Sequence, residues 1–161
     1  MQNQKQLIQK VILLLVLVIN TSFFKDPLMD YSITAKTNGV FMKGSQKYLT
    51  ATIALTNNTA DTLKYLSMTC SRRDFYILRS LDLRWDKQIC TKNLPITLTL
   101  PPHKSDSVKF NFLVKDSLTT PIKYQIGMIL AKDEGNNAMA LLTFKSLKSV
   151  TIWSDTVILR K

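Results

Sequence analysis

The two cysteines, Cys70 and Cys90, are the residues of this 161-residue chain whose chemistry is easiest to constrain. A zinc site needs neighbouring ligands at C-x-x-C or H-x-x-H spacing, and the sequence contains neither. A copper site for electron transfer needs two histidines beside a cysteine, whereas His103 is the single histidine of the chain. We therefore expect no metal site and no cofactor. In an oxidising compartment the two thiols would form a disulfide, which closes a loop of about 20 residues and contributes about 3 kcal/mol.

The stretch PPHKSDS brings His103, Ser105 and Asp106 close together in sequence, which superficially resembles a hydrolase triad. Catalytic triads are gathered from separated segments so that the imidazole can stand between its partners, so these residues are better explained as a solvated corner. Paired carboxylates for acid–base catalysis are scarce, because Glu134 is the only glutamate. The four glycines include no phosphate-binding loop. We expect a protein that is not an enzyme, although a serine–lysine or aspartate mechanism remains open.

The segment between the cysteines is rich in the residue types that dominate binding hot spots, namely arginine, tyrosine and tryptophan. The candidate residues are Arg72, Arg73, Tyr76, Arg79 and Trp85. A disulfide at both ends would hold the segment in shape and reduce the entropy lost on binding. We therefore interpret this segment as the partner-binding surface. The alternative is that Phe75, Tyr76 and Trp85 cap one end of a hydrophobic core, with the arginines solvated around them.

The amino terminus has the layout of a secretory signal peptide. Lys5 and Lys10 precede the apolar run 11–19, which is followed by Asn20, Thr21 and Ser22. A membrane-spanning helix needs about 20 apolar residues, more than this run supplies before Asn20, so a retained anchor is the weaker interpretation. We predict a signal peptide at residues 1–22, a single domain at residues 23–161, and a secreted or periplasmic protein without a stable membrane span after cleavage.

Lysine and arginine outnumber the acidic residues by 22 to 11, which gives a formal net charge of +11. A nucleic-acid-binding protein would cluster these charges and interleave them with aromatic residues. Here the lysines are mostly scattered singly, as expected for the solvated faces of strands. We expect no nucleic-acid partner, although a diffuse positive field could weakly favour anionic surfaces.

Period-two alternation recurs along the chain after residue 30 and predicts an all-β protein. Strands are expected at 31–36, 48–56, 63–70, 74–78, 96–100, 108–114, 124–130, 139–144 and 150–159, the last as one strand or a pair. Asn38 and Gly39 suit a tight hairpin turn, and residues 57–61 suit the turn of a second hairpin that ends at Cys70. Residues 79–88 fit neither template and are interpreted as a loop with one helical turn.

Eight or nine short strands at intervals of about ten residues indicate an antiparallel β-sandwich, with a small closed barrel as the alternative. Asn57-Asn58-Thr59 matches a glycosylation acceptor, but asparagines are also what such a turn needs. No repeat or linker divides the chain.

Several phrases resemble a group of uncharacterised small exported bacterial proteins with an immunoglobulin-like β-sandwich. These are YLTATIALTNNTADTLKYLSMTC, the following DFY, CTKNLPITLTLPPHKS and IWSDTVIL. The specific parts are the hairpin expected to end at Cys70 and the C-x-K-N-x-P stretch from Cys90 to Pro95. In that pattern an aromatic residue often stands where this chain has Arg72. The resemblance implies an immunoglobulin-like sandwich of about eight strands, export and the cysteine pair, and it implies no activity.

The function that these observations favour is a non-enzymatic exported interaction domain that binds a protein or cell-surface partner through loops and edge strands. The alternative is an inhibitor of secreted proteases, because an immunoglobulin-like sandwich can present an exposed loop to an active-site cleft.

Export generates the first testable prediction. Mass spectrometry of the protein recovered from its native envelope should find a new amino terminus between Thr21 and Lys25, because the apolar run is too short for an anchor. An intact Met1 on a membrane-bound chain would instead establish the anchor.

Overall fold

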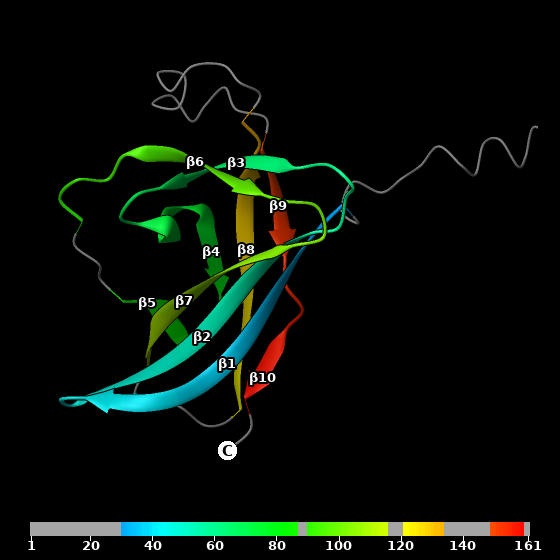
Figure 1. Ribbon diagram of the computed structural model, residues 1–161. Helices are drawn as coiled ribbons and strands as arrows, with labels where there is room; N and C mark the ends of the chain where they lie inside the picture. Colours follow the sequence, from blue (N-terminus) through cyan, green and yellow to red (C-terminus); the bar gives the residue numbers. More distant parts are fainter. Residues whose placement is uncertain (1–29, 87–89, 116–120, 134–148, 160–161) are drawn as a thin grey trace, which may run out of the picture.

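The computed structural model describes residues 30–86, 90–115, 121–133 and 149–159 (Figure 1). It confirms the prediction of an all-β fold. A 3-10 turn, η2, at Arg72–Phe75 precedes β4. The strands are β1 (Tyr31–Lys43), β2 (Gln46–Asn57), β3 (Leu63–Met68), β4 (Tyr76–Arg79), β5 (Leu83–Trp85), β6 (Pro95–Leu100), β7 (Ser105–Val114), β8 (Ile122–Ala131), β9 (Ser149–Trp153) and β10 (Val157–Leu159). The signal-peptide prediction and the strand expected at 139–144 lie outside the described residues.

The first sheet has the order β1-β2-β7-β5, and all its neighbours are antiparallel. Strand β2 explains how the sequence builds it. Leu49, Ala51, Ile53 and Leu55 alternate with threonines and alanine, and these four side chains are almost completely buried. The opposite face is polar, where Thr50 Oγ1 donates to Asn111 Oδ1 at 2.8 Å. Alternation therefore assigns one face to the core and one to solvent.

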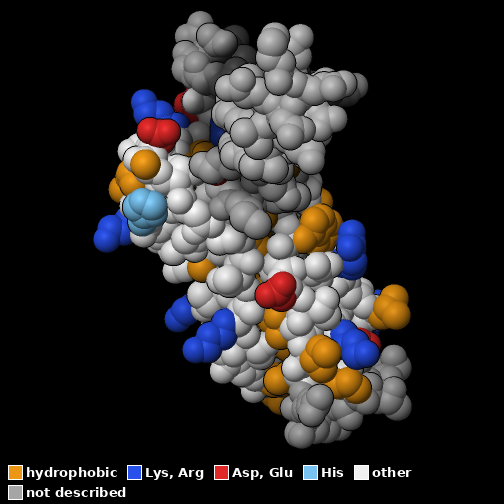
Figure 2. All heavy atoms as spheres, turned by 90° about the vertical axis from the view of Figure 1, so that its right-hand side faces the viewer, with side chains coloured by type: hydrophobic (Ala, Val, Ile, Leu, Met, Phe, Trp, Pro, Cys, Tyr) orange, Lys and Arg blue, Asp and Glu red, His pale blue; other side chains and the backbone are white. Residues whose placement is uncertain are grey.

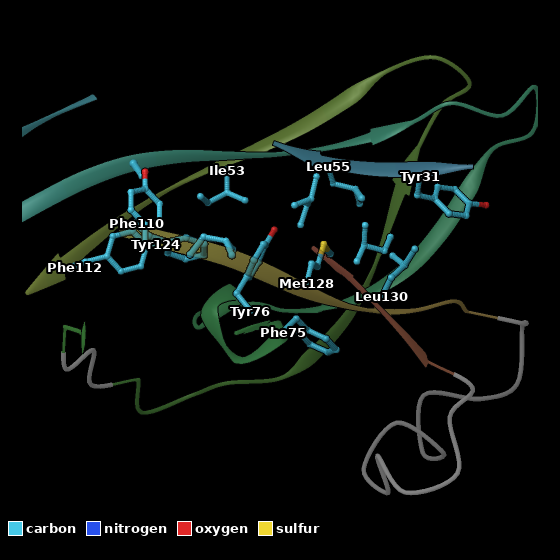
Figure 3. Close-up of a cluster of buried hydrophobic side chains, with 14 of the residues drawn as sticks. Tyr31, Ile53, Leu55, Phe75, Tyr76, Phe110, Phe112, Tyr124, Met128 and Leu130 are labelled. Carbon is cyan, nitrogen blue, oxygen red and sulfur yellow. The ribbon is translucent and has the colours of Figure 1, made fainter. Parts of the chain in front are cut away.

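A second sheet is centred on β8, with β4 on one edge and β9 and β10 on the other. Strands β3 and β6 form a small third sheet. Figure 3 shows side chains of the first sheet, including Ile53 and Phe110, facing those of β8, including Tyr124 and Met128, across the core. The described sheets are not closed into a barrel, so the sandwich prediction is confirmed.

Lys and Arg side chains lie mostly apart from one another on one face of the sandwich. Figure 2 shows separate Lys and Arg side chains on the face that it presents, with hydrophobic side chains between them. Within the residues that the structure describes, no helix has the length and hydropathy needed to cross a membrane.

The turn predicted at Asn38 and Gly39 is wrong. Strand β1 continues to Lys43, with a register shift between Thr37 and Gly39, and the turn lies at Gly44 and Ser45. Gly44 has a φ of 62°, the left-handed conformation that glycine adopts without steric cost. Asn38 instead donates from Nδ2 to Thr52 Oγ1 at 2.8 Å across the ladder. The asparagine–glycine pair thus marks a bulge in a long strand.

The hairpin predicted to end at Cys70 is also wrong. Strand β2 pairs with β1 and β7, whereas β3 pairs with β6, so residues 58–62 carry the chain from one sheet to another. Both faces of β3 are covered around Tyr65, Leu66 and Ser67, and Cys70 is exposed. Period-two alternation identifies the strands but does not say which neighbour each of them joins.

Buried Asn57 holds this crossing in place. Its side chain is fully enclosed, and Nδ2 lies 2.7 Å from the carbonyl oxygen of Asp61, 3.1 Å from that of Leu100 and 3.2 Å from that of Pro101. Its Oδ1 accepts from the backbone and hydroxyl of Thr59. Asn57 therefore serves the turn, and its burial leaves no room for a glycan in the folded chain.

Residues 79–88 differ from the loop that the sequence predicts. Leu83, Arg84 and Trp85 form β5, which pairs with the end of β7. The helical turn occurs earlier, as η2. Leu83 is buried and Trp85 half-buried while Arg84 between them is exposed, so the strand alternates over too few residues to be recognised from sequence.

The predicted disulfide joins Cys70 to Cys90, with their Cα atoms 6.1 Å apart, within the usual range for such bridges. It lies just beyond the β3–β6 ladder, where the backbone N–H of Thr69 donates to the carbonyl of Leu94 at 2.9 Å. The bridge therefore continues the pairing of these strands by covalent means.

Asn57 generates a stability prediction. Asn57→Ala should lower the free energy of unfolding by about 2 to 3 kcal/mol, because three carbonyls and the Thr59 groups lose their partner inside the protein. Asn38→Ala is the control, since it removes an exposed side-chain bond and should cost under about 1 kcal/mol. Urea denaturation measures both, and equal costs would contradict the anchoring role.

The disulfide generates a further stability prediction. Cys70→Ser should lower the melting temperature by several degrees, because about 3 kcal/mol is lost and each kcal/mol shifts a domain of this size by about 2 to 4 °C. Non-reducing peptide mapping should recover the Cys70–Cys90 peptide pair. Two free thiols in protein purified under oxidising conditions would refute the bridge.

Candidate functional site

The segment between the cysteines begins at a hydrogen-bond network around Asn93. The backbone N–H groups of Cys70 and Ser71 donate to Asn93 Oδ1 at 3.3 and 3.1 Å. Asn93 Nδ2 donates to Asp74 Oδ2 at 2.8 Å, and Ser71 Oγ donates to Asp74 Oδ1 at 2.8 Å. Asn93 therefore has an anchoring role in the C-x-K-N-x-P stretch, because it fixes the start of the segment to the loop that leads into β6.

Arg72 forms an ion pair with Asp106 at the start of β7. Tyr65 on β3 donates its hydroxyl to the same carboxylate oxygen of Asp106 at 2.6 Å. Burial raises the pKa of Tyr65 far above its ordinary value, and the hydrogen bond to Asp106 raises it further, so the phenol keeps its proton and acts as a donor. Arg72 thus links η2 to two different sheets.

Arg73 is held against Trp85. Its guanidinium carbon lies 5.8 Å from the centroid of the Trp85 ring, and Nη1 donates to the backbone carbonyl of Asp86. The Trp85 ring packs edge-on against Phe110, with centroids 5.2 Å apart, and lies 4.9 Å from Phe112. Trp85 is half-buried, so one part of it belongs to the core and another remains accessible.

Tyr76 belongs to the core. Its ring meets Phe110 edge-on with centroids 5.0 Å apart, and burial raises the pKa of Tyr76 to about 12. Phe75 beside it is also buried. For Phe75, Tyr76 and Trp85 the structure therefore agrees with the alternative interpretation, in which these rings cover the core.

Arg79 differs from the other candidates because it is exposed and stacked on an aromatic ring. Its guanidinium carbon lies 4.0 Å from the centroid of Trp153 on β9, and Nη1 donates to Gln125 Oε1 at 3.3 Å. Trp153 pairs with Gly127 across the β8–β9 ladder, and a Cβ on Gly127 would lie 2.9 Å from the ring. The glycine therefore leaves the space in which the ring lies, and the ring in turn supports Arg79.

A hollow of about 490 Å³ adjoins Arg79, lined by the end of β4, the loop that follows it and the first half of β8. Leu81 lines it and is 88% exposed, the most exposed large hydrophobic residue that the structure describes. Lys123 and Gln125 line it as well, and Ser80 Oγ donates to the backbone carbonyl of Lys123 at 2.7 Å, which fixes the loop after β4. We call Arg79, Leu81, Lys123, Gln125 and Trp153 the Arg79 surface.

The structure separates the three polar residues of the PPHKSDS corner. His103 is exposed with a φ of 55°. The Ser105 hydroxyl lies 2.8 Å from that of Thr56, whereas Asp106 binds Tyr65 and Arg72. Among the described residues, no group of three or more His, Cys, Asp or Glu side chains could hold a metal ion.

Sequence reasoning missed Tyr65, Asp106, Asn93 and Trp153. The carboxylate of Asp106 meets an arginine that is 34 residues away, and no local pattern encodes such a pair. Gly127 was a possible signal for Trp153, because it is a lone glycine within a strand. Aromatic rings commonly cover such a glycine from the neighbouring strand, as Trp153 does here.

Comparison with known proteins finds a likeness in fold alone. No protein-family model matches the chain, and no curated protein matches it in sequence. The fold is similar to the crystal structure of a FixG-related protein from Vibrio parahaemolyticus, with a TM-score of 0.41 and 14% identity over 82% of this chain and 98% of that chain. A likeness at this level says nothing about what this chain binds.

Proposed function

We propose that this chain is an exported, non-catalytic interaction domain that binds a protein partner through the Arg79 surface. The observation that carries the proposal is the stacking of exposed Arg79 on Trp153, 4.0 Å from the ring centroid, beside the hollow lined by Leu81. Arginine and tryptophan are enriched in binding hot spots. A guanidinium already held on a ring loses little conformational freedom when a partner arrives.

The chemistry of the Arg79 surface favours a partner with both apolar and acidic groups. Leu81 offers an exposed apolar side chain, while Arg79 and Lys123 place two positive charges beside it. Complementary charge steers association and fixes register, and the apolar contact supplies affinity.

The remaining candidate residues of the segment contact other parts of the protein and hold the chain that leads to Arg79. Arg72 binds Asp106, Arg73 lies over Trp85, and Tyr76 packs in the core. Their contacts fix the path of the chain into β4, which ends at Arg79. We assign them positioning roles and assign Arg79 the contact with the partner.

Export is supported by the layout of residues 1–22 and by the cysteine pair. A disulfide persists in oxidising compartments and is rare in the cytosol. The Cys70–Cys90 bridge, whose Cα atoms lie 6.1 Å apart, is therefore compatible with a secreted or periplasmic protein.

The proposal predicts that Arg79→Ala abolishes capture of a partner from the native envelope. The loss of stacking at an exposed position costs only about 0.5 to 1 kcal/mol of stability, so the variant should remain folded. Arg84→Ala is the matched control, because Arg84 is an exposed arginine of the same segment on β5. Arg79→Lys should retain partial binding, since it keeps the charge and loses the planar stack.

The measurement is quantitative affinity capture with melting temperatures recorded for each variant. An unchanged set of captured proteins with Arg79→Ala would refute the proposal. Capture of a protease whose activity the chain blocks would favour the inhibitor alternative instead.

A further inference from the structure

The tip of the β1–β2 hairpin extends beyond the sheet that supports it (Figure 1). We define the hairpin tip as residues 40–47. Strand β7 pairs with β2 only from Tyr48 to Thr56, so the part of the ribbon from Val40 to Lys47 has no third strand beside it. This part of the ribbon is therefore open along both edges and at its end.

The hairpin tip exposes hydrophobic side chains on both faces of the ribbon. Val40, Phe41 and Met42 are consecutive and are 41%, 40% and 61% exposed. Successive side chains of a strand point to opposite faces, so a flat partner lying on one face would leave the other apolar face in water. An apolar medium that the tip enters from its end would cover both faces together.

The charge of the hairpin is uniformly positive. Lys36, Lys43 and Lys47 lie on the two strands, and residues 31–60 contain no aspartate or glutamate. Lys43 and Lys47 flank the apolar side chains, because Met42 pairs with Lys47 and Lys43 pairs with Gln46. An apolar tip with lysines around it matches an anionic lipid surface, where the chains enter the interface and the ammonium groups meet the headgroups.

The two strands of the tip are paired with each other almost to the end of the hairpin. Pairing continues to Lys43 and Gln46, so only Gly44 and Ser45 lie outside the ladder. Gly44 closes the turn with a φ of 62°. The Phe41 ring stacks on Tyr48 with centroids 5.2 Å apart and planes 15° from parallel, which keeps the ribbon in one shape. The backbone groups on the outer edges of the ribbon have no third strand to pair with, so the tip would lie at the hydrated headgroup level of a bilayer and not in its hydrocarbon core.

We propose that the hairpin tip inserts into the interface of an anionic lipid bilayer, as a peripheral contact separate from the Arg79 surface. Val40, Phe41 and Met42 enter the interface, and Lys43 and Lys47 contact anionic headgroups. The shared positive charge of the ribbon would also suit an acidic protein. The exposure of apolar side chains on both faces favours the lipid, and the test separates the two.

The test uses Met42→Trp as a fluorescent probe on the processed protein, with vesicles of phosphatidylcholine alone or mixed equally with phosphatidylglycerol. The mixed vesicles should shift the emission to shorter wavelength, and brominated lipids should quench it. The matched control is Leu81→Trp, which reports an apolar position more exposed than Met42 on a different edge and should not respond. Trp85 and Trp153 supply a background emission, so the wild type is measured in parallel. Quenching of the Met42→Trp variant beyond that of the wild type reports the position of the tip itself, so the reading holds even if residues 1–22 remain attached.

Two further variants test the cause of binding. Phe41→Ser combined with Met42→Ser should weaken binding to the mixed vesicles at least tenfold. Lys43→Glu combined with Lys47→Glu should abolish this binding, because two attractions to anionic headgroups become repulsions. Leu94→Ser, at an apolar position 64% exposed, and Lys109→Glu are the matched controls and should bind as the wild type does. Unchanged melting temperatures would show that the tip variants remain folded.

An unshifted and unquenched probe at position 42 would overturn the proposal, as would tip variants that bind the mixed vesicles as tightly as the wild type. Cross-linking of the tip to an acidic protein without any response to vesicles would also overturn it.

Discussion

Tyr65 is the residue on which the three sheets depend. Its strand, β3, pairs with β6, and Tyr65 itself forms an isolated antiparallel bridge with Lys132 at the end of β8. Its hydroxyl donates to Asp106 on β7 of the first sheet at 2.6 Å. A tyrosine can do this because the ring fills the apolar interior while the phenol reaches a polar group at its far end. With 1% of its surface exposed, Tyr65 has exchanged water for these contacts, and Arg72 balances the charge of the carboxylate that it binds.

The same junction determines where the segment between the cysteines can run. Arg72 must approach Asp106, and Asn93 must receive the N–H groups of Cys70 and Ser71, so the chain enters β4 from a fixed point. The four residues of β4 then pair with β8, and the strand ends at Arg79 opposite Gln125. Gly127 admits the Trp153 ring to which Arg79 binds. The exposed arginine is thus placed by buried contacts. A partner that bound it, as we propose, would not need to order a loop at the moment of association.

The sequence predicts the strands of this fold much better than their partners. Alternation identified the buried residues of β2 and β8, because burial of one face is a local property of the chain. It failed at the crossing after Asn57, since pairing between β3 and β6 is set by contacts distant in sequence. It failed at Asn38 because a bulge and a turn use the same residues. The Arg72–Asp106 pair was unpredictable for a similar reason, whereas the disulfide could be predicted because the chain has two cysteines and thus one intramolecular pairing.

The two surfaces for which we propose functions differ in how the fold supports them. The Arg79 surface lies on the second sheet, in which β8 is paired on both of its edges. Its chemistry is mixed, with Leu81 beside two cations. The hairpin tip has two strands and no core beneath it. It has apolar side chains on both faces, and its charged residues are all lysines. An isolated ribbon that exposes apolar groups loses stability and invites aggregation, and natural proteins usually protect such edges with charge. Here the lysines flank the apolar residues without covering them. A ribbon of this composition is explained more directly by contact with an anionic interface than by the needs of the fold, because neither its side chains nor its turn contribute to the core.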